Sequence, residues 1–266
     1  MDDHKQWLAG VFDRAAPTYD RVGTAYHAHF AGRLLDLAGP QREARLLDVA
    51  CGRGAVLVAA AQRGLGDLTG IDVSPAMIEL ARADLAAAGC EAELRVMDAE
   101  RLDFPDASFD VLTAAFALFF LPDPARAAAE FVRVLRPGGV VAVSTWGAED
   151  ERWAFEDDLL PAAGAPRRRA LQQPFDSAEE VAALLGAAAV TSLDVQEEET
   201  EVWFATKEQW WDWHWSFSVR GILEQLTPEA LAAYRDGCFR EMDALETTNG
   251  FPLRLRALMV TGRGVR

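Results

Sequence analysis

A hydrophobic strand that runs directly into glycines and then a helix begins at Leu46, in the stretch L-L-D-V-A-C-G-R-G-A-V. Such a unit is typical of α/β folds, in which glycines let a ligand approach the backbone and the helix N-terminus favours an anionic group. A dinucleotide fingerprint reads G-x-G-x-x-G, with its first glycine directly after the strand. Here Asp48 lies inside the end of the strand, and only Gly52 and Gly54 follow at that spacing. The stretch therefore favours a nucleotide-type ligand other than a nicotinamide dinucleotide.

Strand-like and helix-like segments alternate along the first half of the chain. Strands are predicted at 46–50, 68–73, 93–97, 109–114 and 140–144, and helices at 55–63, 75–88 and 125–135. Strands separated by helices predict a doubly wound parallel sheet with helices on both faces. Right-handed crossovers then bring the ends of the first four strands to one rim, where ligands bind.

The second half of the chain lacks this regular alternation of strands and helices. We predict helices at 149–163 and 177–186, the latter opened by a Ser177–Glu180 capping box, a polar linker at 166–174, and late strands at 190–195 and 252–261. Between those strands lies a helical block, 207–244, rich in tryptophan. The expected organisation has four parts: N-terminal helices over the ligand site (1–40), an α/β core (41–200), an aromatic-rich helical cap (201–247) and a terminal strand of the core (248–266).

Length, charge and cysteine content narrow the function classes. A chain of 266 residues, half of them hydrophobic, fits one large α/β domain with an added cap. A formal net charge of −16 repels phosphate-rich partners, so a nucleic-acid partner is not expected. No apolar run approaches the roughly 20 residues of a membrane span. The three cysteines lie far apart, which excludes a zinc ribbon or disulfide framework and favours a reducing, cytoplasmic compartment without a metal site.

Three carboxylates follow three successive strands. Asp48 suits a ligand ammonium group, because a carboxylate at a buried strand end needs a cationic or hydrogen-bonding partner. Asp72, 24 residues later, occupies the position from which an acid accepts ribose hydroxyls. Asp98 is suited to an exocyclic amine such as that of adenine, and Met77 offers soft apolar contact to a ring. Capping a loop or helix remains the plain alternative for each acid. Together they predict a ligand with an amino acid, a ribose and an adenine.

Four motifs resemble those of class I S-adenosylmethionine-dependent methyltransferases, in particular the small-molecule branch that includes ubiquinone/menaquinone C-methyltransferases. They are L-L-D-V-A-C-G-R-G-A, G-I-D-V-S-P-A-M-I-E-L-A-R, M-D-A-E-R-L-D-F-P-D-A-S-F-D-V-L and V-L-R-P-G-G, and the resemblance covers about residues 11 to 146. It implies a Rossmann-like, seven-stranded, mostly parallel sheet whose last strand is antiparallel, and S-adenosyl-L-methionine as cofactor. The residues that it implies for cofactor binding are Tyr19, Asp48, Ala50, Gly52, Gly54, Asp72, Val73, Met77, Asp98 and Ala99.

The acceptor side is less determined. Methyl transfer mainly requires that the acceptor be held in position. Hydroxyl or amine acceptors can also require a base. His27 is the candidate base; it lies with His29 on a predicted helix, 21–38, and at most one of the two faces the pocket. Phe116 and Phe119 form an expected apolar wall for the acceptor. Trp211 and His214, in W-W-D-W-H-W-S-F, either line an acceptor pocket or dock the cap onto the core.

The chain is thus expected to transfer a methyl group to a small aromatic or polyketide-like acceptor in specialised metabolism, as a monomer or homodimer. Methyltransferases that act on nucleobase or glutamine amines often carry an Asn/Asp-Pro-Pro-aromatic motif after the fourth strand. This chain has A-F-A-L-F-F-L-P-D there. A protein of the same fold that binds the cofactor but acts as a cyclase or binding protein is the alternative. A nicotinamide oxidoreductase is disfavoured by Asp48 and the missing third glycine.

Overall fold

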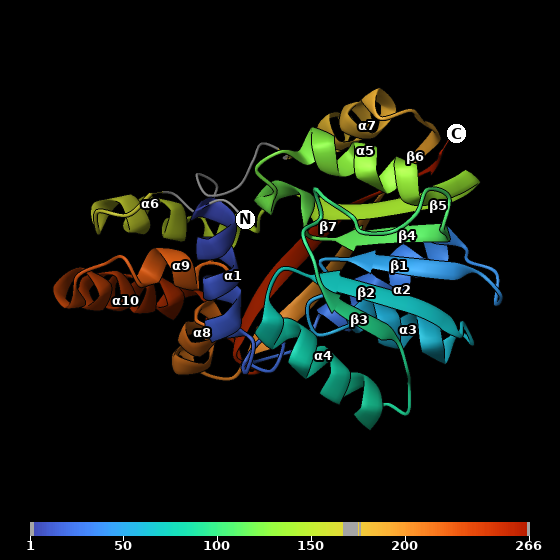
Figure 1. Ribbon diagram of the computed structural model, residues 1–266. Helices are drawn as coiled ribbons and strands as arrows, with labels where there is room; N and C mark the ends of the chain where they lie inside the picture. Colours follow the sequence, from blue (N-terminus) through green and yellow to red (C-terminus); the bar gives the residue numbers. More distant parts are fainter. Residues whose placement is uncertain (1–2, 167–174, 176, 265–266) are drawn as a thin grey trace.

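A seven-stranded mixed sheet forms the centre of the molecule, as seen in a computed structural model that describes residues 3–166, 175 and 177–264 (Figure 1). The strand order is β3-β2-β1-β4-β5-β7-β6. Strand β7 runs antiparallel to both of its neighbours, and the pairs from β3 to β5 are parallel. The expected seven-stranded, mostly parallel sheet is confirmed.

Strands and helices alternate as far as β5. The strands are β1 (Arg45–Val49), β2 (Asp67–Asp72), β3 (Glu93–Val96), β4 (Phe109–Ala115), β5 (Leu135–Trp146), β6 (Val190–Phe204) and β7 (Phe251–Gly264). The α-helices are α1 (Asp3–Ala15), α2 (His27–Ala38), α3 (Ala55–Gln62), α4 (Pro75–Ala87), α5 (Pro124–Val134), α6 (Phe155–Ala162), α7 (Ala178–Ala187), α8 (Lys207–His214), α9 (Arg220–Leu223) and α10 (Pro228–Met242). Short 3₁₀ turns are η1 (Leu118–Phe120), η2 (Glu151–Trp153) and η4 (Asp243–Leu245).

Burial explains why the central strands read as continuous apolar runs. Leu46, Leu47 and Val49 of β1 are fully buried, because helices cover both faces of the sheet. The crossovers from β1 to β2 and from β4 to β5 advance in opposite directions, so right-handedness places α3 and α5 on opposite faces. Helix α2 packs on α3, and α7 packs on α5.

Side-chain caps fix where several helices begin. The Ser74 hydroxyl accepts the Met77 N–H, and Pro75 occupies the first turn of α4. Ser177 and Glu180 form the predicted capping box at the start of α7. This N-cap fixes the start of α4 directly after β2, at the rim of the sheet where Asp72 lies.

Two predicted helices differ from the structure. The helix expected at 21–38 begins only at His27, because Asp20 and Gly23 have φ of +54° and +71° and the Asp20 carboxylate accepts the Tyr26 N–H at 3.1 Å. Residues 20–26 therefore form a turn. The helix expected at 149–163 is divided into η2 and α6. The predicted linker, 166–174, lies outside the described residues apart from Pro166.

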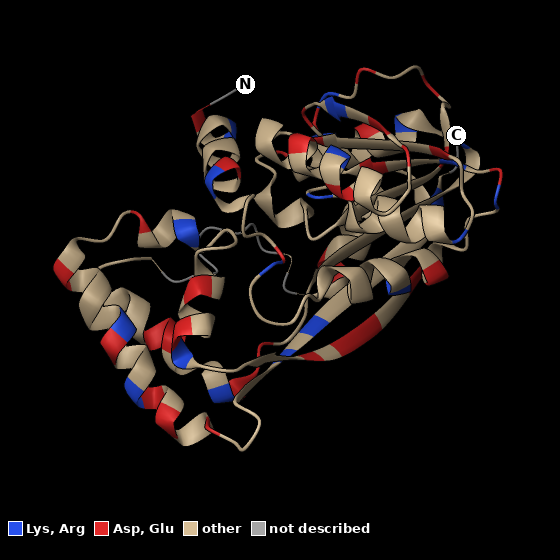
Figure 2. Ribbon diagram, turned by 90° about the horizontal axis from the view of Figure 1, so that it is seen from below, with Lys and Arg blue, Asp and Glu red and all other residues tan. Residues whose placement is uncertain are grey.

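The last strands are longer than predicted. Strands β6 and β7 pair from Val190–Gly264 to Phe204–Phe251, which exceeds the expected 190–195 and 252–261. Figure 2 shows their paired ribbons extending to the cap, with acidic residues along β6 and basic ones along β7. The Glu-rich run 197–201 suits an exposed edge strand, and because this run is polar, hydrophobic patterning did not predict the second half of β6. Strand β5 also begins earlier than expected and contains Pro137-Gly138-Gly139, with a register shift opposite β4.

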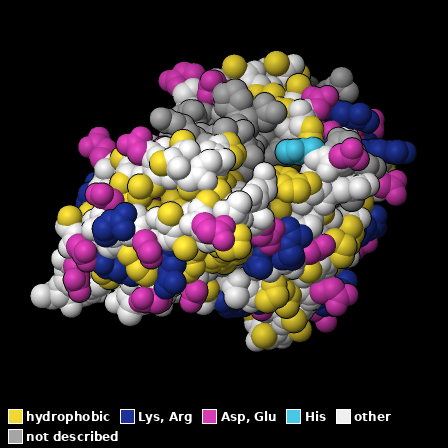
Figure 3. Space-filling model, turned by 90° about the vertical axis from the view of Figure 1, so that its left-hand side faces the viewer, with side chains coloured by type: hydrophobic (Ala, Val, Ile, Leu, Met, Phe, Trp, Pro, Cys, Tyr) yellow, Lys and Arg dark blue, Asp and Glu magenta, His cyan; other side chains and the backbone are white. Residues whose placement is uncertain are grey.

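The cap lies at one end of the sheet, with α1 between the cap helices and the strands (Figure 1). It combines α8, α9 and α10 with α6, a segment that precedes β6, and α6 packs against α10. The cap has its own core, in which Trp210, Tyr234 and Cys238 are fully buried. On the outer face of the molecule at this end, charges of both signs are interspersed with hydrophobic side chains (Figure 3).

Candidate functional site

Three adjoining cavities lie beyond the carboxyl ends of the parallel strands. We call them the strand-end cavity (about 780 Å³), the loop cavity (about 490 Å³) and the aromatic cavity (about 1140 Å³); each volume includes space open to solvent. The strand-end and loop cavities share Tyr19, Ala50, Gly52, Ala115 and Phe116. The strand-end and aromatic cavities share Phe120. The three spaces are therefore compartments of one site.

Asp72 lines the strand-end cavity and also holds the loop after β1. Its two carboxylate oxygens accept the N–H groups of Gly52 and Ser74, both at 2.9 Å. Burial raises the pKa of Asp72 to about 6, against the opposing effect of these backbone hydrogen bonds. A carboxylate has about four acceptor sites, so one remains for a ligand hydroxyl beside the backbone N–H groups of Gly52, Ser74 and Val73. The carboxylate therefore has a structural role and remains available to a ligand.

The other end of the strand-end cavity carries a buried ion-pair cluster. Lys5 Nζ of α1 lies 2.7 Å from an Asp98 oxygen and 2.5 Å from a Glu100 oxygen. Val73, Met77 and Ala99 line the same cavity, as expected. Lys5 was not anticipated, because its partners lie more than 90 residues away and no local motif marks it; its rarity, as one of two lysines, is the only hint in the sequence.

Asp48 lies at the loop cavity together with Ala50 and Gly52. Its side chain is 1% exposed, and its carboxylate accepts the Thr113 hydroxyl at 2.7 Å. Burial raises the pKa of Asp48 to about 7. Gly54 does not belong to this group: it caps α3 with φ of +85°, and it lines none of the three cavities. Its role is that of a helix cap.

Tyr19 and His27 meet in the loop cavity. The Tyr19 hydroxyl lies 2.9 Å from His27 Nε2, and His27 Nδ1 lies 3.1 Å from an Asp20 oxygen. Burial raises the pKa of Tyr19 well above its ordinary value, so the hydroxyl keeps its proton. Because the Asp20 carboxylate can only accept, we assign the imidazole hydrogen to Nδ1, which faces it, and Nε2 then accepts from the Tyr19 hydroxyl. His27 thus faces Tyr19, and it does not line the aromatic cavity.

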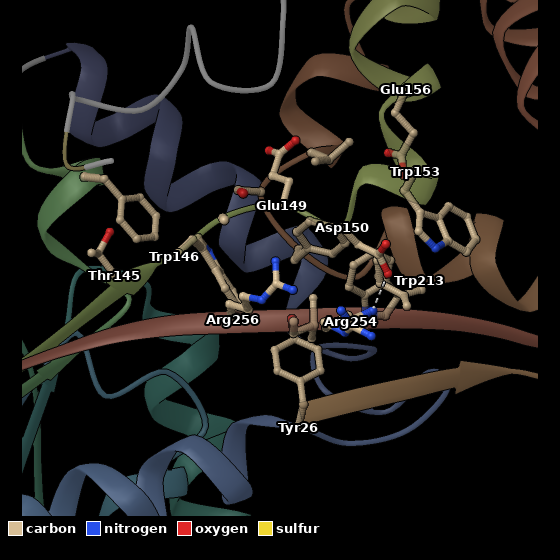
Figure 4. A pocket seen from close by; sticks show the side chains of 18 of the residues that line it. Tyr26, Thr145, Trp146, Glu149, Asp150, Trp153, Glu156, Trp213, Arg254 and Arg256 are labelled. Carbon is tan, nitrogen blue, oxygen red and sulfur yellow. Dashed lines mark hydrogen bonds between the residues drawn. The ribbon is translucent and has the colours of Figure 1, made fainter. Parts of the chain in front are cut away.

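The aromatic cavity is framed by rings from the core and the cap. Tyr26, Trp146, Trp153 and Trp213 point toward it, with Phe119 and Phe217 in its wall (Figure 4). Trp146 stacks on Phe116 with ring centroids 4.1 Å apart and an interplanar angle of 24°. Since Phe116 lines both other cavities, this stacked pair lies at their border with the aromatic cavity, and the strand-end and aromatic cavities meet at Phe120. The site thus has two cavities that contain the strand-end carboxylates on one side and a cavity framed by aromatic rings on the other.

Trp211 and His214 lie outside all three cavities. The His214 ring is fully buried, with Nδ1 3.1 Å from the Trp210 carbonyl and Nε2 2.9 Å from Glu156. Trp211 packs against Tyr234 instead. Because Trp210, Trp213 and His214 form the buried face of α8, Trp213 reaches the cavity. The sequence alone does not show which of the two aromatic faces of α8 is buried.

Charged residues also line the aromatic cavity: Glu149, Asp150, Glu156, Arg254 and Arg256. The sequence patterns did not single them out: the two arginines lie in the predicted strand 252–261 and the three acids in the predicted helix 149–163, and neither pattern shows that these segments meet at one cavity. Among the described residues, no group of three or more His, Cys, Asp or Glu is arranged to hold a metal ion. In the same part of the chain, no helix is long and apolar enough to cross a membrane.

Comparisons with known proteins agree on one family. Residues 47–143 match the methyltransferase domain family. The chain is 34% identical over 271 residues to the nocamycin O-methyltransferase of Saccharothrix syringae, covering 95% of this chain and 97% of that protein. It is 38% identical over 145 residues to the aklanonic acid methyltransferase DauC of a Streptomyces strain, covering 53% and 66%. The fold matches the YcgJ protein of Bacillus subtilis with a TM-score of 0.61 at 22% identity, over 90% of this chain and 99% of that one.

Proposed function

This chain belongs to the S-adenosylmethionine-dependent methyltransferases, and from that premise we propose that it methylates an oxygen atom of a flat, conjugated small molecule in natural product biosynthesis. The observation that carries the proposal is the aromatic slot that adjoins the strand-end and loop cavities across the Phe116–Trp146 pair. Stacked rings favour a planar acceptor, because they supply a large apolar area at little conformational cost. The names of the two relatives, an O-methyltransferase and a methyltransferase of aklanonic acid, support this acceptor class.

The residues of the two smaller cavities fit S-adenosylmethionine. Asp48 would pair with the ammonium of its methionine part beside the Gly52 backbone, and Asp72 would accept its ribose hydroxyls. Val73, Met77 and Ala99 would pack on the adenine ring. Asp98 would accept from the adenine amine through an oxygen that Lys5 holds in place. When bound, the cofactor supplies a methyl group already activated by its sulfonium.

The protein's own contribution would then be to position the acceptor and exclude water. Tyr26, Trp146 and Trp213 would clamp the acceptor rings, and good alignment alone supplies roughly 7–11 kcal/mol in comparable intramolecular reactions. His27 was the candidate base. Because its Nε2 accepts the Tyr19 hydroxyl, we infer that His27 orients Tyr19 and is not the base that removes a proton from the acceptor.

Transfer of a labelled methyl group tests this function. The protein would be incubated with methyl-labelled S-adenosylmethionine and two acceptor sets, hydroxylated anthraquinones and aliphatic alcohols or amines. We expect label in the anthraquinones only. Trp146→Ala should lose transfer and still bind S-adenosylhomocysteine, whereas Trp211→Ala, the same change outside the cavity, should keep most of it. Cofactor binding without labelled product, or equal labelling of both sets, would contradict the proposal.

A further inference from the structure

Two arginines line the aromatic cavity of this strongly acidic protein. Arg254 and Arg256 lie two residues apart on β7, so both face the same side of that strand. Arg256 Nε donates to a Glu199 oxygen at 2.7 Å, and Arg254 Nε lies 3.2 Å from the other oxygen of the same carboxylate. Glu199, on the exposed edge strand β6, thus pairs with both guanidinium groups and does not itself line the cavity.

The acids of the cavity have other partners. Asp150 pairs with the Arg152 guanidinium and accepts the Arg254 backbone N–H at 2.9 Å. Glu156 accepts from His214, and Glu149 is also engaged. In contrast, the terminal nitrogens of Arg256 have no hydrogen-bond partner among residues 3–166, 175 and 177–264. The polar groups of this cavity that are available to a ligand therefore include the terminal N–H donors of the Arg256 guanidinium.

Arg256 lies close to the boundary between the aromatic cavity and the other two. The Gly147 N–H donates to the Arg256 carbonyl at 2.8 Å, which holds β7 beside the end of β5. The Arg256 guanidinium and the Trp146 ring line the same cavity (Figure 4). Trp146 in turn stacks on Phe116, which lines the strand-end and loop cavities. The free guanidinium donors thus belong to the same cavity as Trp146, which lies at the border with the strand-end and loop cavities.

We propose that the acceptor is an acid whose ionised oxygen, a carboxylate or the enolate of a conjugated dicarbonyl, binds to Arg256. This rests on the proposed function and names its substrate class. A planar guanidinium fork matches the two oxygens of either group, and charge-assisted hydrogen bonds are strong where rings exclude water.

An ionised oxygen also removes the need for a base. The acceptor oxygen forms a bond to the methyl carbon while the carbon–sulfur bond breaks, and that electron pair stays on sulfur, leaving a neutral thioether. No proton has to be removed at this step, which agrees with a His27 Nε2 that is occupied by Tyr19. The methylated product is a neutral ester or enol ether, which loses its attraction to Arg256 and is released.

Paired probes test the charge preference directly. Anthraquinone-2-carboxylate would be compared with its carboxamide, and 2-hydroxy-1,4-naphthoquinone with its methoxy analogue, by quenching of tryptophan fluorescence with S-adenosylhomocysteine saturating. We expect at least one acid to bind about tenfold or more tightly than its neutral partner. The pair that shows the preference tells a carboxylate acceptor from an enolate.

The variants assign this preference to one side chain. Arg256→Gln should abolish it and Arg256→Lys should keep part of it. Arg263→Gln, on the same strand but exposed and bound to the Gly138 carbonyl, should leave it unchanged. Melting curves and S-adenosylhomocysteine affinity would show that each variant is folded. Equal binding of acids and neutral partners, or a preference that survives in Arg256→Gln, would overturn the inference. If neither member of either pair binds while S-adenosylhomocysteine does, the flat-acceptor proposal fails and this inference with it.

Discussion

Cofactor binding should tighten as the pH rises from 5.5 to 7.5, and Asp48→Asn should remove most of that dependence. The carboxyl is 1% exposed, and burial raises its pKa to about 7. A ligand ammonium binds the ionised carboxylate, so below that pKa each molecule must first lose a proton to bind well. An isosteric amide cannot ionise and still accepts the Thr113 hydroxyl at the same position.

The expected size follows from the ionised fractions. With a pKa of about 7, Asp48 is about 3% ionised at pH 5.5 and about 76% at pH 7.5, a change of about 25-fold. Asp72, with a pKa of about 6, adds a further factor of about four. A carboxyl with an ordinary pKa would be ionised throughout and add nothing. Asp48→Asn should therefore retain only the fourfold change and bind more weakly than the wild type at pH 7.5.

The stability of the ligand-free protein should change in the opposite direction. Since folding raises the pKa of Asp48, the native state holds more protons than the unfolded state between the ordinary value, near 4, and about 7. This carboxyl's contribution to stability is thus present below that window and is lost as the pH rises through it. Asp48→Asn should flatten the resulting fall in melting temperature.

Isothermal titration of S-adenosylhomocysteine at pH 5.5, 6.5 and 7.5 measures the effect. Asp110→Asn serves as a matched control, because this carboxyl lies near the opposite end of β4 and binds Arg45 and Arg136. It should reproduce the wild-type pH dependence. A wild-type change of less than threefold, or an Asp48→Asn curve as steep as that of the wild type, would refute the reasoning.

Three further changes have definite expected outcomes. Lys5→Met should weaken S-adenosylhomocysteine binding several-fold and lower the melting temperature, because it leaves the carboxylates of Asp98 and Glu100 without their cation at a largely buried site. An unchanged affinity in a titration would show that Lys5 is not part of the cofactor site. Asp72→Ala should lower both affinity, by about tenfold or more, and stability, because the carboxylate also holds Gly52 and Ser74; a loss of stability alone would defeat the ribose assignment. Trp210→Ala should cost about 3–5 kcal/mol in urea unfolding with cofactor affinity unchanged in the folded protein, and a cost below 1 kcal/mol would contradict its place in the cap core.

The cofactor half of the site could be predicted from the sequence because its determinants are local. Asp48, Asp72 and Asp98 lie at or just after the ends of three successive strands, and right-handed crossovers bring these strand ends together. Gly54 caps α3 and lines none of the three cavities, and its sequence position could not show this, because a glycine at a helix start looks the same whether it faces a ligand or closes a turn.

The acceptor half depends on tertiary contacts that no local pattern records. Whether Trp211 or Trp213 faces the cavity is decided by how an eight-residue helix docks, and two aromatic faces offered no way to choose. Arg256 lies inside the predicted strand 252–261, but the strand pattern does not show which cavity the side chain lines. Lys5 meets Asp98 across 93 residues of chain, a contact that no periodicity indicates.

A crystal structure with S-adenosylhomocysteine and the tightest-binding acid probe tests the central claim most directly, namely that the aromatic cavity presents an acceptor oxygen to the methyl donor. We expect the sulfur to lie where the strand-end cavity meets the aromatic cavity, at Phe120, and the probe between Tyr26, Trp146 and Trp213. One ionised oxygen should contact Arg256, close enough to the sulfur for a methyl group to span the gap, with the reacting atoms roughly 3–3.5 Å apart. A sulfur that faces away from the aromatic cavity, or a probe bound elsewhere, would contradict the account.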